Sequence, residues 1–241
     1  MHAIILAGGF GTRLQSVIKD VPKPMAPING KPFLQYLLDY LCTQNITKII
    51  FSVFYQHETI IKYFKNNYKG LLLEYVIDEK PLGTGGAIKN ALAKTNAKNI
   101  FIINGDTFLE LDYKKMHAAH IQNGAKLTIA VKEIINADRY GTVKITKDNI
   151  IEKFLPPKKI KIGNINVGVY LVNVETLRSL LKNLPEKFSF ENEFLTTYAN
   201  TSELYAFKTK NFFIDIGIPE DYANFSSKVT IPNLHITSVQ G

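Results

Sequence analysis

The chain opens with AIILAGGFGTR, residues 3–13, in which an apolar run passes directly into a glycine-rich loop. The run at 3–7 contains no polar residue, and continuous apolar strands are typical of a sheet buried on both faces. Glycine lets the backbone approach a ligand closely and present its N–H groups to phosphate oxygens. The stretch therefore predicts a buried strand followed by a phosphate-binding loop, with a plain strand-to-helix turn as the alternative.

Two common phosphate-binding loops do not fit this spacing. The dinucleotide-binding pattern G-x-G-x-x-G requires glycine at position 14, which is Leu14 here. The Walker loop ends in Gly-Lys-Ser/Thr, and Thr12 and Arg13 do not supply that ending. The loop must therefore be of another kind, with an arginine directly behind its glycines.

Apolar strands alternate with helical patterns further along the chain. Helical spacing is clear at 33–41, where apolar residues recur after Pro32 at a plausible helix start. The alternation predicts an α/β fold with a Rossmann-like, mostly parallel mixed sheet and helices on both faces. In the first half we expect strands at 3–7, 48–54, 71–77 and 99–103, and helices at 33–41, 58–64 and 87–93. In the second half we expect strands at 127–131, 142–145, 167–172, 204–207 and 212–214, and helices at 176–181 and 219–225.

Length and composition favour one folded unit. The chain has 241 residues, of which 46% are hydrophobic, enough to bury one sizeable core. No apolar stretch approaches the ~20 residues that span a bilayer, and the N-terminal run is too short for a signal peptide. We therefore expect a single cytoplasmic domain over 1–241 without a membrane partner. The tail at 228–241 is compatible with an edge strand, a dimer contact or a loose end.

The charge balance limits the classes of partner. Lys and Arg number 29 against 21 Asp and Glu, a formal net charge of +8 that suits anionic partners. The lysines are scattered and form no basic block, so we do not expect nucleic-acid binding. The one cysteine, Cys42, lies in an apolar helical pattern and is expected to be a small core residue.

Two further motifs present polar groups from constrained backbone. In VPKPM, residues 21–25, Lys23 stands between two prolines that restrict the local backbone, which suits a charge that must point at one place. In LGTGGAI, residues 82–88, glycines precede a helix and free backbone N–H groups for a base or a phosphate. The alternatives are an exposed lysine in a proline-rich loop and a helix start capped by Thr84.

A pair of aspartates follows two apolar strands. Asp106 comes after the run at 100–103, and Asp215 comes after the run at 212–214. Open α/β sheets place their ligands at such strand ends, and a carboxylate there needs a cation or a partner. Carboxylates together with substrate phosphates are the usual way in which proteins hold Mg²⁺. The alternative is that each aspartate makes a turn.

Other chemistry has weaker support. The pattern G-x-S-x-G is absent, so no serine nucleophile of the hydrolase type is indicated. His117 and His120 are three residues apart and could share a metal, but no third ligand stands near them. Glu191 and Glu193 could form an acid–base pair, although exposed glutamates are the simpler interpretation.

Taken together, the motifs GxGTR, PKP, LGTGGA and NGD resemble those of the sugar-1-phosphate nucleotidylyltransferases in order and spacing, from Met1 to about Phe225. NVGVY at 166–170 and FIDIGIP at 213–219 are similar to two later motifs of that family. Within it, the sequence looks closest to the D-glycero-α-D-manno-heptose 1-phosphate guanylyltransferases. Enzymes for mannose 1-phosphate and N-acetylmuramate 1-phosphate share much of the pattern, and uridylyl-, cytidylyl- and thymidylyltransferases are further alternatives.

The resemblance implies a nucleotide-binding half at 1–110 and a sugar-phosphate-binding half at 111–227. Catalytic contacts with phosphates would come from Arg13 and Lys23, and Mg²⁺ would be held by Asp106 and Asp215. The implied nucleotide-binding residues are Leu6, Ala7, Gly8, Gly9, Gly11, Thr12, Glu79, Gly83, Thr84 and Gly105. The implied sugar-phosphate-binding residues are Asn104, Tyr140, Gly141, Asn166, Glu191 and Lys158. The family often carries a Glu-Lys pair whose lysine reaches the sugar phosphate, and this sequence departs from that pattern. The contact would come from Lys153, from Lys158 or from neither.

The implied reaction is attack by a sugar 1-phosphate oxygen on the α-phosphorus of a nucleoside triphosphate, with GTP favoured and pyrophosphate released. It would supply a nucleotide sugar for bacterial surface polysaccharide such as capsule. No side-chain nucleophile is needed, because a phosphate monoester is largely a dianion at neutral pH. The competing interpretation is a nucleotide-sensing domain of the same fold without catalysis, and a homodimer is compatible with the sequence.

Overall fold

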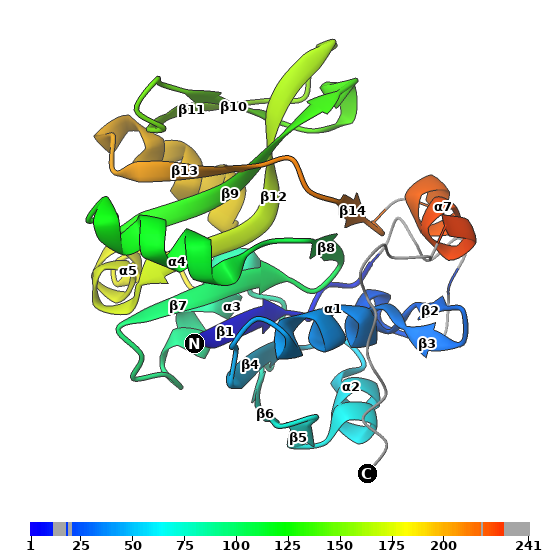
Figure 1. Cartoon of the computed structure of the whole chain (residues 1–241). Helices are drawn as coiled ribbons and strands as arrows, with labels where there is room; N and C mark the ends of the chain where they lie inside the picture. Colours follow the sequence, from blue (N-terminus) through cyan, green and yellow to red (C-terminus); the bar gives the residue numbers. More distant parts are fainter. Residues whose placement is uncertain (12–17, 19–20, 218, 229–241) are drawn as a thin grey trace.

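The structure is a computed structural model that describes residues 1–11, 18, 21–217 and 219–228. A single large sheet runs through it, with helices packed along its faces (Figure 1). Its main path has the order β11-β10-β12-β7-β1-β4-β6-β5, and β9 pairs with β12 and with β13. The strands are β1 (His2–Leu6), β4 (Lys48–Val53), β5 (Asn67–Tyr68), β6 (Leu71–Ile77), β7 (Asn99–Asn104), β9 (Leu127–Ile135), β10 (Thr142–Ile145), β11 (Ile151–Leu155), β12 (Ile162–Asn173) and β13 (Leu204–Thr209).

The centre of the sheet is parallel. β1 pairs in parallel with β4 on one side and with β7 on the other, and β4 pairs in parallel with β6. The register sets Leu6 opposite both Ser52 and Asn104. Three chain segments that are far apart in sequence therefore end side by side at one edge of the sheet. Antiparallel strands of the second half extend the sheet beyond β7, which confirms a mixed α/β fold.

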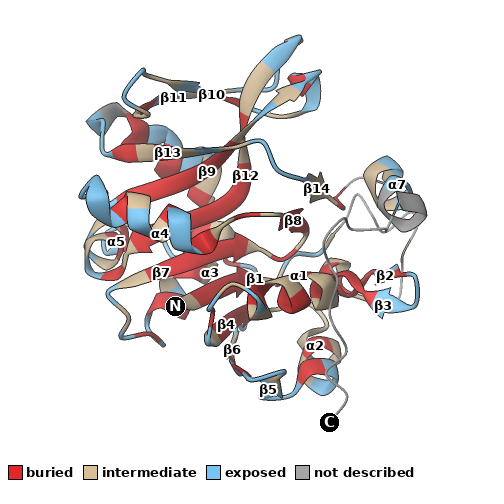
Figure 2. Cartoon of the chain, viewed as in Figure 1, coloured by how far each residue is buried: buried red, intermediate tan, exposed pale blue. Residues whose placement is uncertain are grey.

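Helices cover both faces of the sheet, as the alternating burial of its strands requires. In β1, Ala3 and Ile5 belong to one buried cluster and Ile4 to a second cluster. The first cluster takes residues from α1 (Phe33–Cys42), α2 (His57–Phe64) and α4 (Tyr113–Gln122). The second takes residues from α3 (Gly83–Leu92), α5 (Val174–Leu181), the π-helix η3 (Phe190–Leu195) and α6 (Thr196–Tyr198). Figure 2 shows the central strands buried between these layers.

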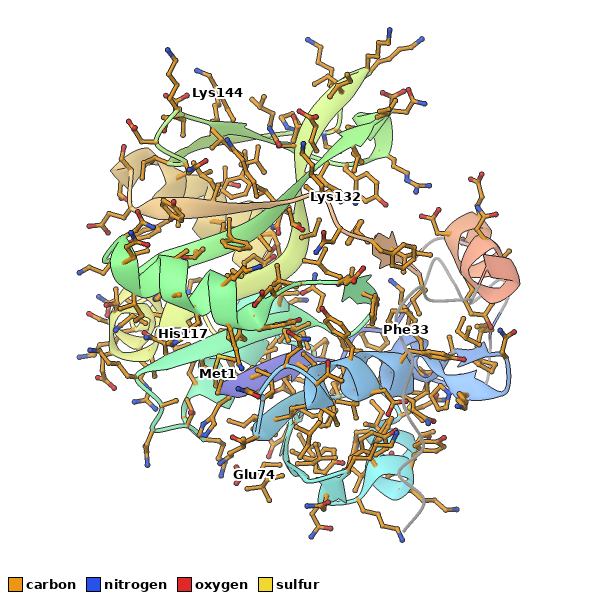
Figure 3. The ribbon with its side chains drawn as sticks, in the orientation of Figure 1. Met1, Phe33, Glu74, His117, Lys132 and Lys144 are labelled. Carbon is orange, nitrogen blue, oxygen red and sulfur yellow. The ribbon has the colours of Figure 1, made fainter. Side chains whose placement is uncertain are left out.

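Local sequence accounts for several helix boundaries. Pro32 precedes α1 in an extended conformation and leaves Phe33 to begin the helix. The side chains of Asp112 and Asn173 accept hydrogen bonds from the N–H groups of Lys115 and Thr176, at 2.9 Å each, and so cap α4 and α5. Phe33 is fully buried under the sheet, whereas Lys144 projects from its rim (Figure 3).

The remaining elements are short. The 3₁₀ turn η1 (Lys23–Met25) leads into the hairpin of β2 (Pro27–Ile28) and β3 (Lys31–Pro32). β8 (Thr107–Leu109) and β14 (Phe213–Asp215) form a separate antiparallel pair, and α7 (Pro219–Lys228) follows β14. Two further 3₁₀ turns are η2 (Ala137–Arg139) and η4 (Ala199–Thr201).

The expected elements are found, with differences at their boundaries. α3 begins at Gly83 and not at 87, because the glycines of LGTGGAI form the first turn of the helix and do not precede it. β12 runs for 12 residues where six were expected, since its polar N-terminal part pairs with the second half of β9. The segment 156–159, between β11 and β12, is exposed and carries no regular structure. The tail prediction concerns residues that lie, apart from Lys228, outside the described part of the chain.

Candidate functional site

A cavity of about 370 Å³ opens at the carboxyl edge of the parallel strands. The strands that supply its wall are β7, β1, β4 and β6, which are neighbours in that order. Strands lie about 4.8 Å apart, so the ends of β7 and β6 are separated by roughly 14 Å across the cavity. Its lining residues are Leu6, Ala7, Gly8, Gly9, Phe10, Gly11, Lys23, Pro24, Ser52, Phe54, Asp78, Pro81, Leu82, Gly83, Thr84, Ala87, Asn104, Asp106 and Gly217.

The first glycine motif lines the cavity with little side-chain cover. A Cβ atom on Gly9 would meet no atom within 4 Å, so the backbone there faces open space. Gly11 has φ +63°, a left-handed conformation that favours glycine, and its added Cβ would lie 2.9 Å from the Cβ of Lys23. The predicted contacts of Thr12 and Arg13 lie outside the described residues.

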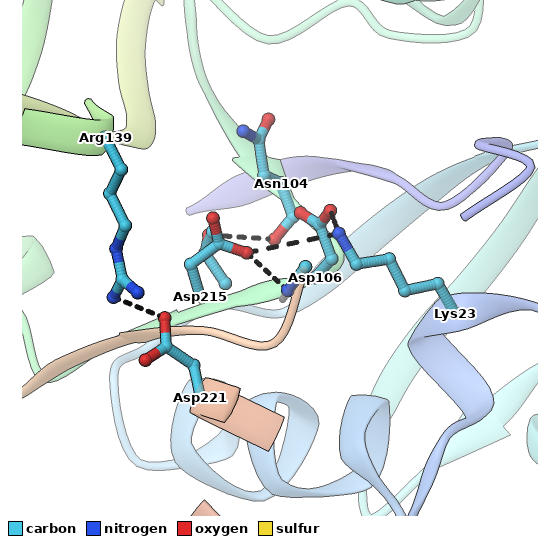
Figure 4. A network of polar contacts seen from close by, with 8 residues as sticks. Lys23, Asn104, Asp106, Arg139, Asp215 and Asp221 are labelled. Carbon is cyan, nitrogen blue, oxygen red and sulfur yellow. Dashed lines mark hydrogen bonds and ion pairs between the residues drawn. The ribbon is translucent and has the colours of Figure 1, made fainter. Parts of the chain in front are cut away.

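Lys23 brings the two predicted aspartates together (Figure 4). Its ammonium group lies 2.5 Å from Asp106 Oδ2 and 4.0 Å from Asp215 Oδ1, and the lysine side chain is only 10% exposed. The prolines on either side hold this segment, because Pro22 is extended and Pro24 is buried in η1. The predicted alternative of a freely exposed lysine is therefore wrong.

The convergence of the aspartates is built by the backbone. Asp106 follows β7 directly, and Asp215 ends β14, where it pairs in register with Thr107 of β8. The N–H of Ile216 donates to the carbonyl of Asp106 over 3.0 Å. Next to them, a Cβ on Gly217 would lie 2.5 Å from the Lys23 ammonium and 2.6 Å from Asp215 Oδ1. Two carboxylates separated by more than one hundred positions thus share one cation.

This arrangement has the donor set that a magnesium ion uses. One or two carboxylates, completed by substrate phosphates and water, are its usual protein ligands. The carboxylates of Asp106 and Asp215 already face a common positive charge, which the Lys23 ammonium provides. No group of three or more His, Cys, Asp or Glu side chains able to hold a metal occurs among the described residues, so phosphate oxygens would have to complete the shell.

Within the second glycine motif, Gly85 and Gly86 are packed against protein, whereas Leu82, Gly83, Thr84 and Ala87 line the cavity. The carbonyl of Phe188 accepts a 3.0 Å hydrogen bond from Gly85 N–H. A Cβ on Gly85 would come within 2.1 Å of the Phe188 ring, and one on Gly86 within 2.2 Å of the Glu186 carbonyl. The expectation that these glycines free their N–H groups for a ligand is therefore corrected at Gly85. Thr84 does not cap the helix either, since the N-cap residue is Leu82.

Two of the predicted sugar-side residues, Asn166 of β12 and Glu191 of η3, are joined to Thr84 by a chain of hydrogen bonds. Thr84 donates to Glu191 over 2.6 Å, Tyr170 donates to Glu191 over 3.1 Å, and Asn166 donates to Tyr170 over 2.9 Å. Asn104 lines the cavity, and its buried Oδ1 has no hydrogen-bond partner. The predicted acid–base pairing of Glu191 with Glu193 is replaced by separate bonds, because Glu193 accepts from the N–H of Ser189.

Tyr140 lies close to the lysine–aspartate cluster. Burial, followed by the negative charge of Asp215, raises the pKa of its phenol. Arg139, next to it, stacks over the Tyr140 ring at 5.1 Å and forms a 2.5 Å ion pair with Asp221 of α7 (Figure 4). Gly141 follows on the exposed side, where an added Cβ would lie 3.0 Å from the Leu155 carbonyl.

Of the predicted site residues that the structure describes, eight lie outside the cavity lining: Glu79, Gly105, Tyr140, Gly141, Lys158, Asn166, Glu191 and Asp215. Glu79 and Lys158 are exposed, the latter in the loop after β11, and Lys153 of β11 is exposed as well. Gly105 is buried behind the wall, where its N–H donates to the carbonyl of Leu6 and an added Cβ would approach that carbonyl to 2.7 Å. Gly105 thus supports Leu6, which does line the cavity.

Sequence reasoning missed Asp78 and its neighbours at the β6 end of the cavity. Asp78 is 7% exposed, and its carboxylate accepts from Asn90 at 2.9 Å and from Ser52 at 3.4 Å. Burial raises the pKa of this carboxyl group, which the two hydrogen bonds partly oppose. The signal was present in the sequence, since Asp78 follows the apolar strand at 71–77 much as Asp106 follows its own strand.

The histidine pair on α4 does not form a metal site. His120 is buried, and its Nδ1 lies 2.8 Å from the hydroxyl of Thr128. Burial, with a smaller effect of His117, lowers the pKa of His120 to about 4. His120 is therefore a core residue.

Comparison with known proteins places this geometry in a family. The profile of the nucleotidyl transferases matches residues 2–231. The D-glycero-alpha-D-manno-heptose 1-phosphate guanylyltransferase of Aneurinibacillus thermoaerophilus is 48% identical over 92% of this chain and 95% of its own length. The protein with the same name in Campylobacter jejuni is 44% identical over 93% and 98%.

A solved structure agrees with the sequence relatives. HddC from Yersinia pseudotuberculosis complexed with GMP-PN is 40% identical, with a TM-score of 0.84 over 94% of this chain and 98% of that chain. Across the described part of the chain, no helix is long and apolar enough to cross a membrane.

Proposed function

Because the chain belongs to the nucleotidyl transferase family, we propose that it transfers a guanylyl group from GTP to a sugar 1-phosphate and releases pyrophosphate. The favoured sugar is D-glycero-α-D-manno-heptose 1-phosphate, the substrate in the name of the two relatives that share 44–48% of its sequence. The observation that carries the proposal is the convergence of Lys23, Asp106 and Asp215 beside the first glycine motif.

The reaction joins two anions, so charge neutralisation is the main task of the site. A phosphate oxygen of the sugar attacks the α-phosphorus, a new P–O bond forms, and the bond to the β-phosphate bridging oxygen breaks. Lys23 is placed to hold a phosphate oxygen in the geometry for attack and to balance its charge. The backbone around Gly9 and Gly11 would receive the triphosphate, with Arg13 predicted to contact its outer phosphates.

Asp106 and Asp215 would hold Mg²⁺. When bound, the ion would neutralise charge on the phosphate oxygens as a Lewis acid. These carboxylates fit the role because they already flank a cation and leave further positions to phosphate. Lys23 would then release the aspartates and turn its ammonium group to the substrate.

The opposite end of the cavity supports guanine as the base. If the phosphates lie at Asp106, the base lies about three strands away, near Asp78. Guanine offers N1–H and N2–H₂ as neighbouring donors, and a carboxylate can accept from both. Adenine presents an acceptor at N1, which faces a carboxylate unfavourably. Ser52 and Asn90 hold the Asp78 carboxylate in place, and the apolar side chains of Leu82 and Ala87 form the wall beside it.

Each half of the chain would bind a different substrate. Residues 1–110 supply most of the cavity lining and would bind the nucleotide, and residues 111–227 would bind the sugar phosphate through Asn166 and Tyr140. We propose a cytoplasmic enzyme of nucleotide-sugar synthesis for surface polysaccharide such as capsule. The family relationship and the intact set of Lys23 and both aspartates favour catalysis over nucleotide sensing alone.

A substrate panel tests the proposal. The enzyme with Mg²⁺ is incubated with each of four nucleoside triphosphates and with the 1-phosphates of the heptose, mannose, glucose and N-acetylmuramate. Pyrophosphate release is followed, and the nucleotide sugar is identified by mass. We expect the highest kcat/KM with GTP and the heptose 1-phosphate. Absence of pyrophosphate release with every pair would refute the transferase proposal, and preference for another pair would refute the assigned substrates.

A further inference from the structure

The segment 186–191 of the second half is docked onto the first turn of α3. The N–H of Phe188 donates to the carbonyl of Leu82 at 3.1 Å, and the N–H of Gly85 donates back to the carbonyl of Phe188 at 3.0 Å. Gly83 adopts φ +69°, and an added Cβ would lie 2.5 Å from that carbonyl. No side chain can be accommodated between the two segments, so they form a direct backbone-to-backbone contact.

A chain of hydrogen bonds begins at this contact and continues into the second half. We call its four members Thr84, Glu191, Tyr170 and Asn166 the bridging network. The hydroxyl of Thr84 accepts from the N–H of Phe190 at 2.8 Å and donates to Glu191 Oε2 at 2.6 Å. The hydroxyl of Tyr170 donates to Glu191 Oε1 at 3.1 Å and accepts from Asn166 Nδ2 at 2.9 Å. Each oxygen of the Glu191 carboxylate is therefore engaged by a different half of the site.

Tyr170 anchors this network, and the other three members are half-buried. Tyr170 is fully buried, and its ring packs edge-on against Phe190 with centroids 5.3 Å apart. Burial and the neighbouring Glu191 charge raise the pKa of its phenol, which therefore stays a hydrogen-bond donor. Charge-assisted hydrogen bonds are the stronger ones, and breaking one leaves the half-buried Glu191 carboxylate less well satisfied.

One end of the network lines the cavity, and the other lies beside the cavity wall. Thr84 lines the nucleotide cavity. At the other end, Asn166 Oδ1 accepts from the N–H of Gly168 at 3.0 Å, so both polar atoms of the amide are oriented. Gly168 has φ +74°, and an added Cβ would lie 2.5 Å from Asn104 Nδ2, on the wall of the same cavity. The network thus spans from the nucleotide side to the sugar side.

We propose that Glu191 and Tyr170 are positioning residues, which couple the position of the Thr84 side chain to that of Asn166. A residue in the wall of the nucleotide cavity thereby sets the affinity for the sugar phosphate. This inference rests on the proposed transferase function. It differs from the role implied by the family resemblance, in which Glu191 belongs to the sugar-phosphate-binding set. With both oxygens engaged by protein, Glu191 acts by holding Asn166, and its negative charge is not needed by the sugar.

The first test measures KM for each substrate separately in Thr84→Val and Tyr170→Phe, which remove one hydroxyl each at nearly constant shape. We expect KM for the sugar 1-phosphate to rise about tenfold in each, as for loss of one hydrogen bond to a charged group, while KM for GTP changes less than about threefold. Thr84→Ser keeps the hydroxyl and is the matched control, in which KM for the sugar 1-phosphate should rise far less than in Thr84→Val.

The second test is the double variant Thr84→Val/Tyr170→Phe. If the two hydroxyls act through the same carboxylate, the rise in KM for the sugar phosphate is clearly smaller than the product of the single effects. The network is overturned if Thr84→Val raises only KM for GTP, or if the single effects multiply. It is also overturned if Glu191→Gln, whose amide cannot accept from both hydroxyls, leaves KM for the sugar phosphate unchanged.

Failure of the proposed function gives a different result. Wild-type enzyme would then release no pyrophosphate with any substrate pair. In that case the same double-mutant cycle is read in the free energy of unfolding by urea. Non-additive losses in Thr84→Val and Tyr170→Phe support the connected network, and additive losses overturn it whatever the protein catalyses.

Discussion

The two glycine motifs of the chain serve different purposes, which a pair of alanine substitutions separates. At Gly85 an added methyl group would lie 2.1, 2.3 and 2.5 Å from three atoms of the Phe188 ring. Phe188 is 3% exposed and packed in the second core cluster, so its ring has little room to withdraw. At Gly9 the same methyl group would meet no atom within 4 Å.

The expected cost at Gly85 follows from these contacts. Forcing a methyl group into a packed core costs about 1–3 kcal/mol, and the gain in helix propensity on replacing glycine by alanine offsets roughly 0.5–1 kcal/mol of this. Contacts as short as 2.1 Å put this clash in the upper part of that range, so the net loss in Gly85→Ala is about 1–2 kcal/mol. For a chain of this size, this corresponds to a fall of roughly 2–8 °C in Tm.

Thermal unfolding and GTP titration are measured on both variants. We expect Gly85→Ala to lose Tm, and Phe188→Leu in the same chain to restore part of the loss by removing the clashing ring atoms. Gly9→Ala should keep the wild-type Tm but bind GTP more weakly, because the methyl group occupies cavity space. A wild-type Tm in Gly85→Ala, or unchanged GTP affinity in Gly9→Ala, would refute this division of roles.

Three further substitutions test the site and the core. Lys23→Met should lower kcat about 10²–10³-fold with an unchanged near-UV spectrum, and turnover near wild type would remove Lys23 from the mechanism. Asp78→Asn should lower kcat/KM for GTP about 100-fold. It should also improve the use of xanthosine triphosphate, because the C2 carbonyl of xanthine can accept a hydrogen bond from the new amide. An unaltered base preference would exclude Asp78 from base recognition. His120 has its folded-state pKa lowered to about 4, so the unfolded chain binds more protons between pH 4 and 6.5 and stability falls as the pH decreases through that window. In urea unfolding, His120→Gln should remove up to about 3 kcal/mol of this pH dependence of the unfolding free energy. An equally steep fall in stability with decreasing pH in the variant would contradict the assignment to His120.

Much of the fold was predictable because the first half carries strong periodic signals. Runs such as Ile100–Ile103 are too apolar for any position except a central strand, and the helix at 33–41 repeats its apolar residues at helical spacing. The antiparallel second half was harder to predict, since β12 begins with the sequence IGNIN, which has no continuous apolar run, and this part is recognised only by its pairing with β9. The π-helix that carries Glu191 has no periodic signature in the sequence.

The candidate site was predicted where local motifs define it. Lys23, Asp106 and Asp215 were identified from prolines and strand ends, and the structure brings them together. The second glycine motif was misinterpreted because a sequence does not show what approaches a glycine, which here is the segment around Phe188. Asp78 was missed because an isolated carboxylate after a strand resembles a turn residue until its neighbours are known.

The magnesium requirement of the two aspartate variants tests the shared-cation proposal most directly. The Mg²⁺ concentration for half-maximal pyrophosphate release from GTP and the heptose 1-phosphate is measured in wild type, Asp106→Asn and Asp215→Asn. Disturbing even the outer partners of a metal site costs about 10–100-fold in affinity, so loss of a ligand charge should cost at least about tenfold in both variants. Wild-type magnesium dependence in either variant would show that the two aspartates do not share one ion.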